Sequence, residues 1–349
     1  MSPVICFFEN DNYFYSEDYE IHSPSPTENV DLFLQKMNSI FFNHYKIIQI
    51  DFEAFQNSPI KQDLIKVIVL KKYKLISKTE FQTQKFYQLD FKSEISKDEF
   101  IKKIKSIKNE ITAGRIYQVN FTSSLIHLLN KEIDPLQLFY FYFNLFKADY
   151  SAYIPNQNSQ ILCYSPELFL EKKQTSIKTQ PIKGTIQNHL PMSNLLNNKK
   201  ENAELSMIVD LLRNDLQSIC NDPVQVTKHR EILKLEYVTH TYSEIVGSTT
   251  NSTSEILQKM LPGGSISGCP KKESLKVISE YEPYSRGFYT GCIGWWFEND
   301  FKLNLAIRSF LATKNQIKYF TGCGIVADSD PELEWLEFLN KSSLLRSTK

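Results

Sequence analysis

The 349-residue sequence has no excess of charge of either sign, because 40 lysine and arginine residues balance 40 aspartate and glutamate residues. A neutral chain is not attracted as a whole to nucleic acid or to an anionic membrane, so we expect neither as a partner. The sequence also lacks a run of about 18 apolar residues, the length that a membrane-spanning helix requires. An anionic ligand would therefore have to meet cations that the fold gathers locally.

Cysteine is scarce, and the six cysteines lie far apart with no C-x-x-C pair or other spacing typical of a metal finger. Scattered cysteines of this kind indicate reduced thiols and a cytoplasmic protein. The start of the sequence, "MSPVICFFENDNYFYSEDYE", has no basic flank before its short apolar run and soon turns acidic. It does not look like a signal peptide.

Hydrophobic residues form 42% of the chain, enough for a sizeable core in one large domain or two ordinary ones. Residues 1–94 alternate short aromatic and β-branched runs with polar breaks, a pattern that predicts strands. Sharper signals follow, beginning with a helical pattern that Ser96 and Glu99 start as a capping box and Gly114 ends. We therefore divide the chain into an N-terminal strand-rich region, residues 1–94, and a larger domain, residues 95–349, that carries the sharper signals.

Strand-like stretches in residues 95–349 outnumber helices and adjoin one another. Residues 301–312 read as one such strand, whereas residues 199–219 and the segment that begins at Asp330 and Pro331 read as helices. This succession predicts a mixed α+β fold with large antiparallel sheets, not a parallel doubly wound fold.

The helix expected over residues 199–219 places acids among apolar residues. At 100° per residue, Glu201, Glu204 and Asp215 fall inside its apolar arc. Burying a carboxylate without a partner costs several kcal/mol, so each needs a cation, a metal or a hydrogen-bond donor. Pairing with lysine or arginine and ligation of a metal both remain open from this pattern.

The last helix repeats the pattern, because Glu334, Glu337 and Lys341 fall on one face at i, i+3 and i+7. A solvated ladder of ion pairs is the ordinary explanation. If the two acid-bearing helices face each other, they suit a hard divalent cation such as Mg²⁺.

Three further features are compatible with an anionic ligand. The glycine-rich "PGGSISGCPKK" could bind an anion at the amides near Pro270, or form a turn without a ligand. Gly322 and Gly324 form a second glycine pair, and Arg308 lies in an apolar strand, where arginine usually meets a carboxylate.

Lys183, in "QPIKGT", reads by itself as a solvated lysine in a turn. Lysine is almost wholly protonated at pH 7, and making it neutral requires about 4–5 kcal/mol from its surroundings. Burial can supply this energy.

Together these segments resemble the chorismate-binding enzyme family, and within it the component I branch of aminodeoxychorismate synthase. The resemblance runs in unbroken order from residue 114 and rests on these motifs: "GRIYQVNFT", "YSPELFL", "QPIKGT", "ENAELSMIVDLLRND", "VTHTYSEIVG", "LPGGSISGCPK", "EPYSRGFYTGCIGWW", "LNLAIRSF" and "GCGIVADSDPELEWLEFLNKS". It implies two large antiparallel sheets packed face to face with helices outside, and a Mg²⁺-dependent reaction on chorismate.

The resemblance also assigns roles to residues. Glu204 and Glu337 match the family's Mg²⁺ ligands, with Glu201 and Glu334 as further candidates. Residues that match the substrate-binding positions are Gln118, Gly184, Thr185, Tyr289, Arg308, Gly322, Gly324 and Lys341. Lys183, Glu167 and His240 match the catalytic positions around the departing hydroxyl.

Two positions separate the branches of the family. Isochorismate and salicylate synthases resemble each other in having lysine where this chain has Gln118, because they activate water. Anthranilate synthases have alanine in place of Lys183, so the resemblance implies amination of chorismate at ring carbon 4. Lys183 would act as a nucleophile and Glu167 as the proton donor.

No glutaminase signature with a nucleophilic cysteine is found, so we expect ammonia from a glutamine amidotransferase subunit or from solution. An anthranilate synthase component I with an atypical lysine and a catalytically silent chorismate-binding subunit remain as alternatives. The family element that lines the tryptophan site of feedback-regulated relatives is also not found.

Overall fold

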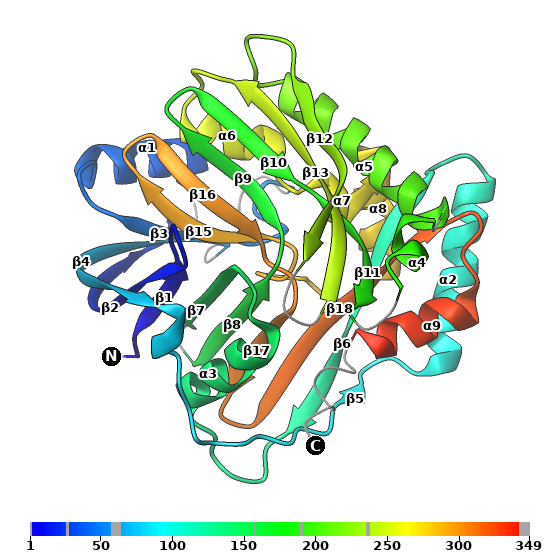
Figure 1. Cartoon of the computed structure of the whole chain (residues 1–349), viewed down its shortest axis with the longest axis horizontal. Helices are drawn as coiled ribbons and strands as arrows, with labels where there is room; N and C mark the ends of the chain where they lie inside the picture. Colours follow the sequence, from blue (N-terminus) through cyan, green and yellow to red (C-terminus); the bar gives the residue numbers. More distant parts are fainter. Residues whose placement is uncertain are drawn as a thin grey trace.

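The computed structural model describes residues 2–25, 28–56, 64–156, 158–188, 191–197, 199–234 and 238–341. In this part of the chain, antiparallel pairing joins 18 strands into one continuous sheet. Figure 1 shows the strands crossing the middle of the molecule and most of the helices at its periphery. The predicted α+β class is confirmed.

The sheet has two halves, which meet at β4 (Ile65–Ser77), because β4 pairs with β2 on one side and with β3 on the other. The first half runs in the order β6 (Gln118–Leu128), β18 (Gln316–Val326), β17 (Ser309–Thr313), β8 (Ser159–Ser165), β7 (Tyr150–Asn156), β1 (Val4–Phe7) and β2 (Asn12–His22). The short strands β5 (Lys92–Ser93) and β14 (Gly268–Cys269) also pair with β6.

The second half runs in the order β3 (Lys46–Ile50), β15 (Cys292–Phe297), β16 (Asp300–Leu305), β9 (Leu168–Lys173), β10 (Ser176–Gln180) and β13 (Val238–Ser248). Strands β11 (Ile182–Gln187) and β12 (Gln225–Lys234) also pair with β13. The two halves contact each other in the core, where the buried Asn304 of β16 donates a hydrogen bond to the carbonyl of Tyr150 in β7 (2.7 Å). This contact agrees with the expected face-to-face packing.

The longer helices are α1 (Val30–Ile40), α2 (Lys97–Thr112), α3 (Pro135–Phe146), α5 (Lys199–Gln217), α6 (Thr253–Met260), α8 (Lys271–Tyr281) and α9 (Pro331–Asn340). Two short helices, α4 (Ser193–Leu196) and α7 (Gly264–Ser267), and the 3-10 turn Lys78–Glu80 complete the set in the described residues. Both predicted N-caps are confirmed: Ser96 accepts from the amide of Glu99, and Asp330 accepts from the amides of Glu332 and Leu333. Of the capping box predicted for Ser96 and Glu99, the structure shows this one of the two bonds. Side-chain oxygens at these positions satisfy amides that have no partner within the helix.

The prediction of one strand over residues 301–312 is wrong. Strand β16 ends at Leu305 and β17 begins at Ser309, and Arg308 between them has a left-handed backbone (φ 51°). The break has a topological cause, because β16 belongs to the second half of the sheet and β17 to the first. The chain must therefore cross between the halves at this point.

The first 94 residues contain a helix that the strand pattern did not predict, α1, whose N-cap Asn29 accepts from the amide of Asp31. Strands on either side of the predicted boundary pair with each other, as β1 does with β7 and β3 with β15. The division at residue 94 stays a prediction. All six cysteines have free thiols, and none of the helices in the described part of the chain is long and apolar enough to span a membrane.

Candidate active site

A cavity of about 730 Å³ is lined by strands of both sheet halves and by helices α5 and α9. It brings together most of the site residues that the sequence predicts. Those that line it are Glu167, Lys183, Gly184, Glu201, Glu204, His240, Tyr289, Arg308, Gly322, Gly324, Glu337 and Lys341.

Three predicted residues stand apart from this lining. Gln118 is buried behind the wall, with its Nε2 atom 3.1 Å from where a Cβ on Gly324 would stand. Glu334 is also buried, and its carboxylate accepts a hydrogen bond from the hydroxyl of Ser329 (2.7 Å). The backbone of Thr185 pairs with His240, but its side chain lies outside the described residues.

Lys183 of "QPIKGT" lies in the bulged strand β11, not in a solvent-exposed turn. The register between β11 and β13 shifts between Lys183 and Thr185, and Gly184 between them has φ 66°. A Cβ at Gly184 would stand 2.7 Å from Cδ1 of Leu195, which real Cβ atoms do not tolerate. Glycine is therefore favoured here by the left-handed backbone, and a larger residue would also have to displace the end of the Leu195 side chain. The bulge presents the half-buried Lys183 to the cavity.

Both polar groups of Gly184 are held by side chains of the cavity wall. Its amide donates to Oε2 of Glu201 (2.9 Å), and its carbonyl accepts a hydrogen bond from Nδ1 of His240 (3.0 Å). Glu201 was predicted as a candidate metal ligand. In the structure its Oε2 atom holds the bulge beside Lys183.

His240 is buried and lies between this bulge and Arg308, whose Nη2 atom is 3.4 Å from Nε2 of His240. Since Arg308 can only donate, Nε2 must accept, and Nδ1 carries the proton that it gives to Gly184. Burial, with the charge of Arg308, lowers the pKa of His240 to about 4. His240 is therefore a neutral imidazole at pH 7.

Glu167 follows β8 and is buried, and its carboxylate accepts a hydrogen bond from the hydroxyl of Ser265 (3.3 Å). Burial raises the pKa of Glu167 to about 7, although Lys183, Ser265 and Arg308 each act to lower it. A carboxyl group with this pKa is partly protonated near neutral pH, so it can give up and take back a proton.

Helices α5 and α9 both contribute carboxylates to the wall of the cavity. Glu204 and Glu337 both line it, and Oε2 of Glu204 lies 3.9 Å from where a Cβ on Gly324 would stand. Asp215, the third acid in the arc, is instead bound to Lys271 (2.6 Å). Carboxylates on two helices facing one polar cavity are a donor set that fits Mg²⁺.

A cluster beside Glu337 contains Glu334. Ligand atoms of Cys323, Glu334 and Glu337 all lie within 4.8 Å of one another. Glu334 is thus close enough to Glu337 to share a ligand with it, although it does not line the cavity, and its role as a metal ligand stays a prediction.

Lys341 and Tyr289 supply polar groups at the other side of Glu337. Lys341 Nζ forms an ion pair with Glu337 (2.9 Å) and donates to the carbonyl of Gly322 (2.5 Å). Burial opposes the charge of Lys341, but Cys323 and Glu337 outweigh it and raise its pKa. Burial also raises the pKa of Tyr289, whose ring stacks on Phe320, so its hydroxyl stays a donor.

Several lining residues had no place in the predicted site: Asn120, Phe146, Pro166, Ile182, Ser265, Ile266, Thr290, Ile307, Tyr319, Phe320, Thr321 and Asn340. The sequence did offer a signal for Ser265, which lies in the glycine-rich motif, and for Asn120, which lies in "RIYQVNFT". The amides near Pro270, for which an anion site and a turn without a ligand were both open, belong to the start of α8, and that end of α8 does not line the cavity.

Comparisons with known proteins agree with this geometry. The family profile described as "chorismate binding enzyme" matches residues 6–347. Aminodeoxychorismate synthase component 1 of Bacillus subtilis is 29% identical over 356 residues, which cover 97% of this chain and 75% of the relative.

Anthranilate synthase component 1 of Synechocystis sp. is 32% identical over 289 residues, covering 77% of this chain and 56% of the relative. The chain thus spans only about half the length of this second relative. Among solved structures, anthranilate synthase component I from Streptococcus pneumoniae superposes with a TM-score of 0.80 at 22% identity, covering 99% of this chain and 91% of that one. This likeness concerns the fold.

Proposed function

The chain belongs to the family of chorismate binding enzymes, and on this basis we propose that it is component I of an aminodeoxychorismate synthase. It would convert chorismate and ammonia to 4-amino-4-deoxychorismate, a step toward 4-aminobenzoate and folate. The observation that carries the proposal is the place of Lys183 on the cavity wall, in a bulge held by Glu201 and His240. Anthranilate synthases resemble this chain around the same motif but have alanine there.

The cations and donors of the cavity suit the two carboxylates of chorismate. Arg308 and Lys341 line it as charged groups, and the buried hydroxyl of Tyr289 remains protonated. Charge-assisted hydrogen bonds from such groups are stronger than neutral ones and fix the orientation of the ring. They also explain how a chain of zero net charge binds an anion.

Lys183 and Glu167 divide the chemistry between them. The neutral Nζ of Lys183 adds to carbon 2 of chorismate, and both ring double bonds shift by one position toward carbon 4. The bond between carbon 4 and its hydroxyl breaks, and the hydroxyl leaves as water with the proton of Glu167. Ammonia then adds at carbon 4, both double bonds shift back, and the bond between carbon 2 and Lys183 breaks, which returns Nζ as a neutral amine. Glu167 recovers its proton from the nitrogen that has gained one, so the sum is chorismate plus ammonia giving product plus water.

Glu204 and Glu337 would hold a Mg²⁺ ion, which supplies a positive charge that anchors a substrate carboxylate. Both carboxylates form the part of the cavity wall that α5 and α9 contribute. Lys341 lies beside the second of these carboxylates, with its Nζ 2.9 Å from Oε1 of Glu337.

Ammonia would come from a separate glutamine amidotransferase subunit. Two relatives are named component 1 of their synthases. A numbered component implies a second one, which supports a partner subunit for this protein as well. Ammonium salts at high concentration should replace the partner in the test tube.

A second candidate is anthranilate synthase component I, which the identity of 32% to the Synechocystis enzyme favours. The two candidates differ in product, since anthranilate forms by loss of pyruvate and fluoresces, whereas 4-amino-4-deoxychorismate keeps the enolpyruvyl group.

The deciding experiment incubates the protein with chorismate, Mg²⁺ and ammonium, and then adds aminodeoxychorismate lyase. We expect 4-aminobenzoate only after the lyase is added. Fluorescent anthranilate without the lyase would establish the second candidate. Binding of chorismate without any product would identify a catalytically silent subunit.

A further inference from the structure

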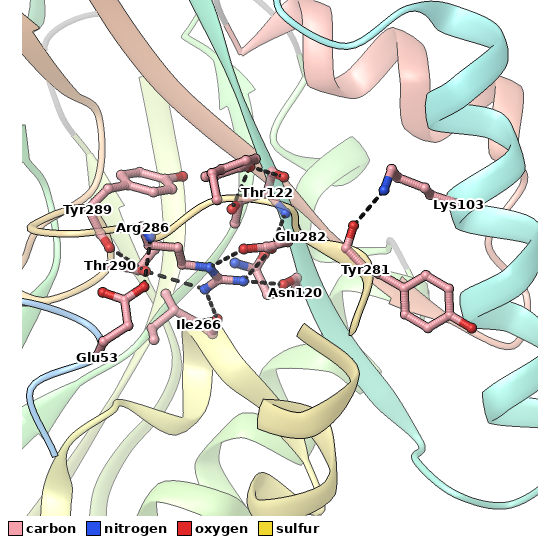
Figure 2. Close-up of polar contacts among 11 residues, drawn as sticks. Glu53, Lys103, Asn120, Thr122, Ile266, Tyr281, Glu282, Arg286, Tyr289 and Thr290 are labelled. Carbon is pink, nitrogen blue, oxygen red and sulfur yellow. Dashed lines mark hydrogen bonds and ion pairs between the residues drawn. The ribbon is translucent and has the colours of Figure 1, made fainter. Parts of the chain in front are cut away.

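Arg286 is buried beside the cavity without lining it, and all its side-chain donors are used (Figure 2). A guanidinium has five N–H groups. Nε donates to Glu282 Oε2 (2.8 Å), Nη2 to Glu282 Oε1 (2.7 Å) and Asn120 O (2.7 Å), and Nη1 to Ile266 O (2.9 Å) and Thr290 Oγ1 (3.3 Å). Five donors therefore meet five acceptor contacts.

Further contacts hold the counterion, the face of the guanidinium and the backbone of Arg286. Oε1 of Glu282 also accepts from the amide of Thr122 (2.7 Å), which ties the carboxylate to β6. The face of the guanidinium lies 4.3 Å from the ring centre of Phe52, and the backbone amide of Arg286 donates to Glu53 (2.7 Å). Few alternative positions are open to a side chain held in this way.

The three acceptors other than Glu282 all belong to residues of the cavity wall. Each lies next to a group with a proposed role. Asn120 pairs with Gly324 across the β6–β18 ladder. Ile266 follows Ser265, whose hydroxyl donates to Glu167, and Thr290 follows Tyr289. The three segments come from different elements, namely β6, α7 and the turn before β15. Arg286 is the point at which the three meet.

Thr290 shows that this junction maintains an unfavourable backbone. It has φ 62°, a left-handed conformation that a β-branched residue rarely adopts. Its hydroxyl donates to the carbonyl of Tyr289 (2.6 Å) and accepts from Arg286, and its amide donates to Ala306 (2.9 Å). Such strain persists only where the surroundings over-determine it.

We propose that Arg286, with Glu282 as its counterion, is a positioning residue that fixes the Asn120, Ile266 and Thr290 segments, and through them Ser265 and Tyr289, relative to the substrate. This role rests on the proposed function. A fully buried ion pair is weak evidence for stability, because desolvation offsets its attraction. The three further contacts of Arg286 to the cavity wall indicate that the pair positions this wall, and that its main role is not to stabilise the fold.

The test compares Arg286→Met and Arg286→Lys with a matched control. Lys46 is also a fully buried cation, donating to the carbonyls of Phe41 (2.8 Å) and His44 (3.1 Å) over the ring of Trp296, and it does not line the cavity. Lys46→Met should lose stability and keep kcat. If Arg286→Met does not fold, Arg286→Lys keeps the charge but has fewer donors and no planar fork.

We expect kcat of the folded Arg286 variant to fall by about 100-fold, the effect of a displacement of about 1 Å, with a much smaller change in KM for chorismate. The alkaline limb of its pH profile should move to higher pH, because Ser265 would no longer stabilise the Glu167 carboxylate. A kcat and a pH profile equal to those of wild type overturn the positioning role. So does an equal loss of kcat in Lys46→Met.

Failure of the proposed function is recognised separately, as absence of product from the wild-type protein. In that case the titration of Glu167 still decides the positioning role. Carbon NMR of labelled glutamate, with Glu167→Gln to assign the signal, should show a higher pKa for Glu167 in Arg286→Lys than in wild type. An unchanged titration overturns the positioning role whatever the activity of the enzyme.

Discussion

The Nη2 atom of Arg308 lies 3.4 Å from Nε2 of His240. This contact makes Nε2 an acceptor, and the opposite ring nitrogen donates to the carbonyl of Gly184 at 3.0 Å. A neutral histidine therefore joins the arginine that would hold a substrate carboxylate to the bulge that carries Lys183. Protonating the ring would place two cations in contact.

The stability of the protein should consequently decrease when acid protonates His240. The pKa is about 4 in the folded protein and about 6.5 in the unfolded chain, so only the unfolded chain takes up the proton between these values. This group contributes its full stability above pH 6.5 and loses about 2 kcal/mol of it by pH 5.

Thermal unfolding at pH 7 and pH 5 measures this effect in wild type and in His240→Gln. The variant should lose less stability between the two pH values. His44→Gln, which replaces an exposed ring, should behave like wild type. Equal acid sensitivity in all three proteins contradicts a buried, neutral His240.

Glu167 should destabilise the folded protein as the pH rises, whereas His240 does so as the pH falls. The pKa of Glu167, about 7, lies above the ordinary 4.5, so ionisation of the buried group destabilises the folded protein progressively between these values. Glu167→Gln should be more stable than wild type by about 3 kcal/mol at pH 8 and no more stable at pH 4. Urea unfolding at the two pH values gives this difference.

The same substitution should lower turnover by about 100-fold or more, because an amide cannot donate the proton that the leaving hydroxyl needs. In wild type the rate should fall as pH rises through about 7, where Glu167 loses that proton. An active Glu167→Gln variant would assign the proton to another group.

Gly184→Ala tests the bulge. The alanine would have φ 66° and a Cβ 2.7 Å from Leu195, so we expect a loss of about 1–3 kcal/mol together with reduced turnover. Gly114→Ala is the matched control, because φ is 75° there but no atom lies within 4 Å of the new Cβ. It should share the backbone strain and keep full activity. Equal turnover in both variants contradicts a bulge that positions Lys183.

Mg²⁺ binding should depend on the two carboxylates that line the cavity. Removing a residue that hydrogen-bonds to a metal ligand typically lowers metal affinity by about 10–100-fold. Glu204→Gln and Glu337→Gln alter the proposed ligands themselves, so we expect each to raise the Mg²⁺ concentration needed by at least this factor. Asp210→Asn, on the same helix as Glu204 but exposed, should not. The stabilisation of each protein by Mg²⁺ against heat measures binding without turnover. An unchanged response in both cavity variants would place the ion elsewhere.

Local signals in the sequence were sufficient for much of the fold. Ser96 and Asp330 start helices for reasons contained in four or five residues. The break at Arg308 could not be found in this way. Its apolar neighbours read as one strand, and only the crossing between the two sheet halves requires the turn.

The same distinction between local signals and tertiary contacts applies to the site. Resemblance located Lys183, Glu167 and Arg308, and the apolar arc of α5 located Glu204. Composition gave no reason to prefer Arg286 over other arginines, because its partners Asn120, Ile266 and Thr290 are brought to it by tertiary contacts. The contact of Glu201 with Gly184 was hidden for the same reason.

Covalent participation of Lys183 is the central claim, and peptide mass spectrometry tests it most directly. The protein is quenched after exposure to chorismate and Mg²⁺ without ammonia, and then digested. The account predicts that one peptide, the one containing Lys183, gains the mass of chorismate less one water, and that ammonium added before the quench removes this mass. An unmodified Lys183 peptide from an enzyme that turns over chorismate at full rate, with Lys183→Ala equally active, would contradict it.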